Sequence, residues 1–93
     1  MTMTTYKIEG LLTRRAQTHG HYPDIAEVAQ GLKSTIRESW QGNHDPELLE
    51  AVDMICHKLA RITVGDEAHR DHWDDIAGYA LLAAKRCGRD GED

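Results

Sequence analysis

The chain has 93 residues and a mass of 10.5 kDa, and its 11 basic and 16 acidic residues give a net charge of −5 with histidine neutral. A chain of this length supports one domain with one modest core, so we expect a single helical domain over residues 1–93. We place its ordered part at about residues 5–87 and a frayed tail at residues 88–93.

Composition also excludes several classes of protein. The basic residues form no block, which disfavours binding to a nucleic-acid backbone regardless of its sequence. No apolar run approaches the roughly 20 residues of a membrane span, and the N-terminus lacks the pattern of a signal peptide. We therefore expect a soluble, cytoplasmic protein that has no membrane partner.

Apolar residues recur at helical spacing nearly everywhere, which predicts an all-α, compact bundle of about four helices. The first helix is expected from about Thr5 to Thr18 and ends at Gly20. The second is expected to begin at Asp24, which forms a capping box with Glu27, and to run to Trp40. Its predicted buried face comprises Ile25, Val28, Ala29, Leu32, Ile36 and Trp40.

The third helix has strong signals at both ends: Asp45 as the N-cap, Pro46 at the first position and Gly65 after the end at about Thr63. The fourth is expected from about Asp71 to Cys87, antiparallel to the third. The predicted core faces are Leu48, Val52, Ile55, Leu59 and Ile62 on the third helix, and Trp73, Ile76, Ala77, Ala80, Ala84 and Cys87 on the fourth. The opposite side of the third helix carries a polar stripe, which is either a solvated face or a row of groups that faces a ligand. Its residues are Glu50, Asp53, His57 and Arg61.

Gly78 and Leu82 are unusual on the other side of the fourth helix. A glycine inside a helix costs about 1 kcal/mol relative to alanine, and Leu82 lies beside it among polar residues. We expect this surface to be covered, either within the chain or by a second copy, and the protein to form a homo-oligomer.

The cysteines and histidines give no clear site. Cys56 and Cys87 fall on apolar helix positions and are expected to be buried free thiols. The close histidine pairs, His19 with His21 and His69 with His72, match neither the HExxH pattern nor a zinc finger, so surface histidines are expected.

Carboxylates open both helices of the predicted hairpin. Glu47 and Glu50 begin the third helix, and Asp71, Asp74 and Asp75 begin the fourth. Facing carboxylates at these spacings can hold Mg²⁺, and Glu50, Asp71 and Asp75 are the candidate ligands. This arrangement loosely resembles the all-α nucleotide pyrophosphohydrolases of the MazG and dUTPase type. The same residues also favour the positive ends of the helix dipoles, so a purely structural role stays open.

Three segments together carry a closer resemblance: RAQTHG at residues 15–20, MICHKLARI at 54–62 followed by Gly65 and Asp66, and DHWDDIAGYA at 71–80. They are similar to a small family of unassigned function common in tailed phages and prophages, with the motifs R-x-x-THG, K-[LI]-[AS]-R-I-x-x-G and D-x-W-x-DIAGYA. The resemblance covers about residues 14–84 and implies a phage-encoded protein in the host cytoplasm.

The leading hypothesis for function is binding of a phosphate-bearing nucleotide, with either Mg²⁺-dependent hydrolysis or sequestration of a defence nucleotide. Lys58 and Arg61 are three residues apart and can reach one phosphate. The alternative is an oligomeric adaptor or inhibitor that binds a host protein, in which case the same charges are structural ion pairs. Whether the protein is an enzyme stays open. The candidate ligand-binding residues are Arg15, His19, Lys58, Arg61 and Tyr79.

Overall fold

The computed structural model describes the backbone of residues 2–90 and the side chains of residues 8–88. The chain forms four helices, α1 (Thr2–His19), α2 (Tyr22–Ser39), α3 (Pro46–Val64) and α4 (Arg70–Asp90), and residues 2–90 contain no strand. This confirms the predicted all-α fold. Because α4 continues to Asp90, residues 88–90 of the expected tail are helical, and residues 91–93 lie outside the described part of the chain.

Local signals explain most helix ends. The Asp45 carboxylate caps α3 by accepting hydrogen bonds from the backbone N–H groups of Glu47 at 3.0 Å and Leu48 at 3.3 Å. The capping box predicted at Asp24 is wrong, because α2 begins at Tyr22 and its N-cap, His21, forms no side-chain capping bond. The His21 carbonyl already accepts from the N–H groups of Asp24 and Ile25, which places Asp24 inside the first turn.

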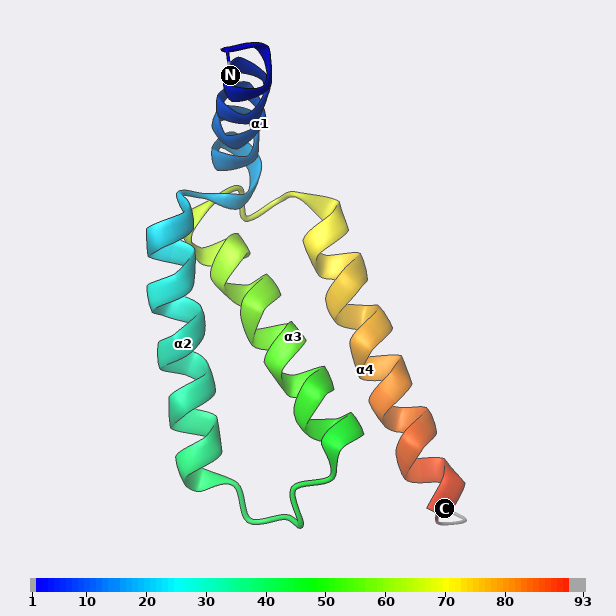
Figure 1. Ribbon diagram of the computed structural model, residues 1–93. Helices are drawn as coiled ribbons and strands as arrows, with labels where there is room; N and C mark the ends of the chain where they lie inside the picture. The colour runs from blue at the N-terminus through cyan, green and yellow to red at the C-terminus, as the bar shows by residue number, and fades with distance from the viewer. Residues whose placement is uncertain (1, 91–93) are drawn as a thin grey trace.

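The helices α2, α3 and α4 lie side by side, with α3 in the middle, and α1 projects beyond one end of them (Figure 1). The antiparallel pairing of α3 and α4 confirms the predicted hairpin. Ion pairs connect the three helices along their length: Arg37 with Asp53 at 2.7 Å, Lys58 with Asp75 at 2.9 Å, and Arg86 with Asp45.

The fully buried core is small and lies mainly between α2 and α3. Ile25, Ala29 and Ala60 form one buried cluster, with Val28 and Val64 packed against it. The predicted core face of α3, from Leu48 to Ile62, is only partly buried. Because α2 and α4 flank α3 in a single row, α3 is covered on two sides only. Both broad faces of this row stay open.

The predicted core face of α4 is wrong for this single chain. Trp73 is 49% exposed, and the alanines and the cysteine predicted to lie with it, Ala77, Ala80, Ala84 and Cys87, are also exposed. His72 is instead fully buried, and Ile76 is half-buried on the same side of α4. The ion pairs of Asp75 and Arg86 with α3 fix this rotation of the helix, because both must point toward α3. No helix in the described part of the chain is long and apolar enough to cross a membrane.

Candidate functional site

The end of α1, the end of α3 and the start of α4 meet at one place, which we call the junction: residues 18–20, 65–66 and 69–72. Two glycines allow the backbones to approach. Gly20 has a φ of +94°, and a Cβ atom there would lie 2.6 Å from the Val64 carbonyl oxygen. A Cβ atom on Gly65 would lie 2.6 Å from the Thr18 carbonyl oxygen. The same Thr18 oxygen accepts a hydrogen bond from the Asp66 N–H at 3.0 Å, which fixes α1 to the loop after α3.

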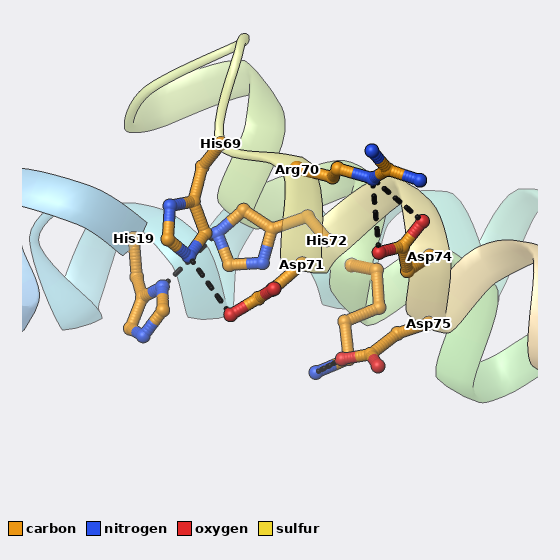
Figure 2. A network of polar contacts seen from close by, with 8 residues as sticks. His19, His69, Arg70, Asp71, His72, Asp74 and Asp75 are labelled. Atoms are coloured by element: carbon orange, nitrogen blue, oxygen red, sulfur yellow. Dashed lines mark hydrogen bonds and ion pairs between the residues drawn. The ribbon is translucent and has the colours of Figure 1, made fainter.

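Three histidines gather at the junction: His19 from the end of α1, His69 from the residue just before α4, and His72 from the first turn of α4 (Figure 2). His19 Nδ1 and His72 Nε2 share a hydrogen bond of 3.0 Å, and the His69 ring centre lies 4.7 Å from that of His72. The His69 Nε2 atom lies 3.7 Å from the exposed Asp71 carboxylate. The prediction of surface histidines is therefore wrong for His72, which is 1% exposed.

The surroundings of His19 and His72 favour their neutral forms. Burial lowers the pKa of His19 to about 4, and the positive charge of Arg61 acts in the same direction. Burial also lowers the pKa of His72, together with the charges of His69 and Arg61, while a backbone hydrogen bond with Thr18 acts against them. At neutral pH one imidazole can therefore donate to the other without a charge.

Three cations near the junction, Lys58, Arg61 and Arg15, differ in their partners. Lys58 is largely buried and pairs with Asp75, whose pKa it lowers. Arg61 is half-buried, and its Nε atom is buried without a hydrogen-bond partner among the described residues. Arg15 is exposed and its charge contributes to lowering the pKa of His19. In residues 8–88 neither arginine forms an ion pair, so the predicted structural pairing holds for Lys58 alone.

A groove lies between the first turns of α3 and the middle of α4, toward the end of the hairpin that is away from the junction. It has a volume of about 680 Å³ and is lined by Glu47, Glu50, Ala51 and Pro46 of α3 and by Tyr79, Leu82 and Lys85 of α4. A smaller hollow of about 430 Å³ shares Tyr79 and Leu82 with it and reaches Asp75. Leu82 is 59% exposed, so the described residues of this chain do not cover it. A Cβ atom on Gly78 would meet nothing within 4 Å, so no close approach explains this glycine.

The predicted magnesium ligands have different surroundings. Glu50 lines the groove, Asp71 lies beside His69, and Asp75 binds Lys58. In the part of the chain that the structure describes, no group of three or more His, Cys, Asp or Glu side chains is placed to hold a metal ion. The magnesium site therefore stays a prediction from the sequence pattern.

The structure thus brings His19 and Arg61 together at the junction, with Arg15 and Lys58 close by, and places Tyr79 in the groove. Sequence reasoning missed His72 as a junction residue, and it also missed the groove residues Pro46 and Lys85. The signal for His72 was its place one turn into a helix that follows a tight glycine-containing connection. Its partner, however, lies 53 residues away.

Comparison with known proteins identifies no relative of this chain. No family model, no curated protein and no solved structure matches the chain significantly.

Proposed function

We propose that the protein is a cytoplasmic nucleotide-binding protein that takes a phosphate group at the junction. The observation that carries the proposal is the buried Nε of Arg61, which has no partner among the described residues, beside the neutral pair His19 and His72.

An unpaired cation of this kind is costly. The buried Nε–H of Arg61 lacks a hydrogen-bond partner among the described residues, which costs about 1–3 kcal/mol, so a complementary anion is favoured. The guanidinium group binds phosphate oxygens through parallel N–H donors, which makes phosphate a well-matched anion. His19 and His72 add N–H donors to the site. Their imidazoles gain a proton more readily once a phosphate dianion offsets the charge of Arg61.

The rest of a nucleotide has space along α4. Tyr79 lies seven residues after His72, about 10 Å along the helix axis. Its ring lines both the groove and the smaller hollow that reaches Asp75. An aromatic side chain in such a position offers a face for a base. This supports a nucleotide with its phosphate at Arg61 and its base near Tyr79.

A thermal-shift screen tests the proposal. The probes are ribo- and deoxyribonucleoside phosphates, cyclic dinucleotides and inorganic pyrophosphate, each with and without Mg²⁺. A ligand at 100 times its dissociation constant adds about 2.7 kcal/mol to the free energy of unfolding, which raises the Tm of so small a domain by 10 °C or more. A shift that requires Mg²⁺ leads to product analysis for hydrolysis, and a shift without it indicates sequestration.

Variants separate the site from the scaffold. Arg61→Leu removes the unpartnered cation, so it should abolish the ligand shift and keep or raise the Tm of the free protein. Arg37→Leu is the matched control, because Arg37 pairs with Asp53 between α2 and α3 and should leave binding unchanged. Ligand affinity that survives Arg61→Leu, or a full screen without any shift, would refute the proposal.

The exposed groove supports a second candidate, an adaptor or inhibitor that binds a host protein. Leu81 and Leu82 are both more than half exposed, and Leu82 lies beside Tyr79 in a groove with an apolar lining. Such a patch is typical of a protein-binding surface. In this case no nucleotide raises the Tm, and Leu82→Arg abolishes capture of the host protein while Leu12→Arg, an equally exposed leucine on α1, does not.

A further inference from the structure

The single chain exposes more surface than a compact domain of its mass. Its accessible surface is 6785 Å², whereas roughly 5,400 Å² is expected for 10.5 kDa, an excess of about 1,400 Å². The radius of gyration is 16.3 Å, against about 12 Å for a compact chain of this length. The projecting α1 accounts for part of this excess. A standard protein interface buries about 800 Å² on each partner, so the whole excess is larger than one such interface.

Helical spacing shows which broad face of the row formed by α2, α3 and α4 carries the open apolar residues. On α3, the residues Leu48, Val52 and Leu59 project from the side opposite Glu50, which lines the groove. On α4, Trp73 and Ala80 project from the side opposite Leu82, which lines the same groove. The two apolar sets therefore share the broad face of the row that points away from the groove. We call this set the open apolar face: Leu48, Val52, Ile55, Leu59 and Ile62 of α3, and Trp73, Ala77, Ala80 and Ala84 of α4.

The open apolar face has the composition of a core. It contains no charged side chain, its α3 residues are half-buried, and its α4 residues are exposed. The α4 residues follow a spacing of four, three and four, the spacing of the seam in paired helices. Three of these four positions are alanines, which let a facing helix approach closely.

A second copy of this chain fits the open apolar face best. A face without charges offers a foreign partner no electrostatic complement to select it, whereas two identical apolar faces match each other across a two-fold axis. We propose that the open apolar face is the interface of a homodimer, in which two rows of helices stack into a two-layer bundle. The groove and Arg61 lie on the other side of the row, so the dimer leaves them accessible.

Light scattering after gel filtration, over low- to high-micromolar concentrations, tests the proposal on the full chain. The wild type should show twice the 10.5 kDa of one chain at the upper concentrations. Ala80→Arg places a charge in the interface and should give monomers. Ala80 is exposed in the single chain, so helicity by circular dichroism should be retained. Leu82→Arg is the control, an equally exposed position on the groove side that should leave the dimer intact.

A second readout covers the case in which Ala80→Arg fails to fold. In Trp40→Phe, Trp73 is the sole tryptophan, and its emission should shift to shorter wavelength as the concentration rises, since the dimer covers its exposed half. A wild type that stays at 10.5 kDa throughout, or a dimer that Leu82→Arg breaks and folded Ala80→Arg does not, would overturn the proposal. An emission maximum of Trp73 that does not change with concentration in a dimeric sample would do the same.

Discussion

Substitution of Gly20 by alanine tests whether the close packing of α1 on the end of α3 stabilises the fold. The added Cβ atom would lie 2.5 Å from Val64 Cγ2 and 2.6 Å from the Val64 carbonyl oxygen, and a backbone carbonyl has little room to move. The φ of +94° adds the cost of a left-handed conformation, about 1–2 kcal/mol for a residue with a side chain. Overpacking adds about 1–3 kcal/mol, so we expect Gly20→Ala to lower the free energy of unfolding by about 2–5 kcal/mol.

Thermal denaturation followed by circular dichroism measures this loss. One kcal/mol corresponds to about 4–8 °C in a domain of this size, so the Tm of Gly20→Ala should fall by about 10 °C or more. Gly78→Ala is the matched control: it lies inside α4 with nothing within 4 Å of its Cβ position, and it should raise stability by about 1 kcal/mol. A Tm of Gly20→Ala at or above that of the wild type would refute the account of the junction.

Three further predictions concern titration, the ion pair on the hairpin and the α3 cap. The pKa of His19 is lowered to about 4 in the folded state, against about 6.5 in the unfolded state. The unfolded chain therefore binds this proton first, so the fold is fully stable above about pH 6.5 and loses stability as pH falls toward 4. Urea denaturation should show the free energy of unfolding falling by up to about 3 kcal/mol over that window, and His19→Gln should flatten the slope. Lys58→Ala should lower the Tm by only a few degrees, because Asp75 is about half exposed; a double-mutant cycle of the two residues measures their coupling, and zero coupling would contradict the pairing. Asp45→Ala removes the acceptor for two backbone N–H groups at the start of α3 and should lower the Tm by several degrees, whereas an unchanged Tm would show that the cap contributes nothing.

Sequence signals that act within a few residues predicted the helices well. Asp45 and Pro46 set the start of α3, and Gly20 and Gly65 set the ends of α1 and α3, because each acts on its own backbone. The start of α2 shows the limit of such signals. The capping pattern at Asp24 competes with Pro23, whose fixed φ suits the first turn, and the helix begins earlier.

The rotation of α4 and the burial of His72 could not be predicted in the same way. Spacing shows which residues of a helix share a side, but it does not show which side meets the neighbouring helix. The most apolar side of α4 was expected to face the core, whereas the ion pairs of Asp75 and Arg86 and the bond of His72 to His19 orient another side inward. These contacts join residues that lie 17 to 53 positions apart along the chain. If a second copy covers the open apolar face, the expectation of an apolar core on α4 holds for the dimer.

The order of contacts along the chain also bears on how the protein folds. The packing of α2 on α3 and of α3 on α4 joins helices that follow one another, and such local contacts give fast folding. The contact of α1 with the end of α3 instead closes a long loop from Thr18 to Asp66, and the entropic cost of loop closure grows with loop length. We expect the hairpin to form first and α1 to join last, so that substitutions at Gly20 accelerate unfolding and leave the refolding rate nearly unchanged.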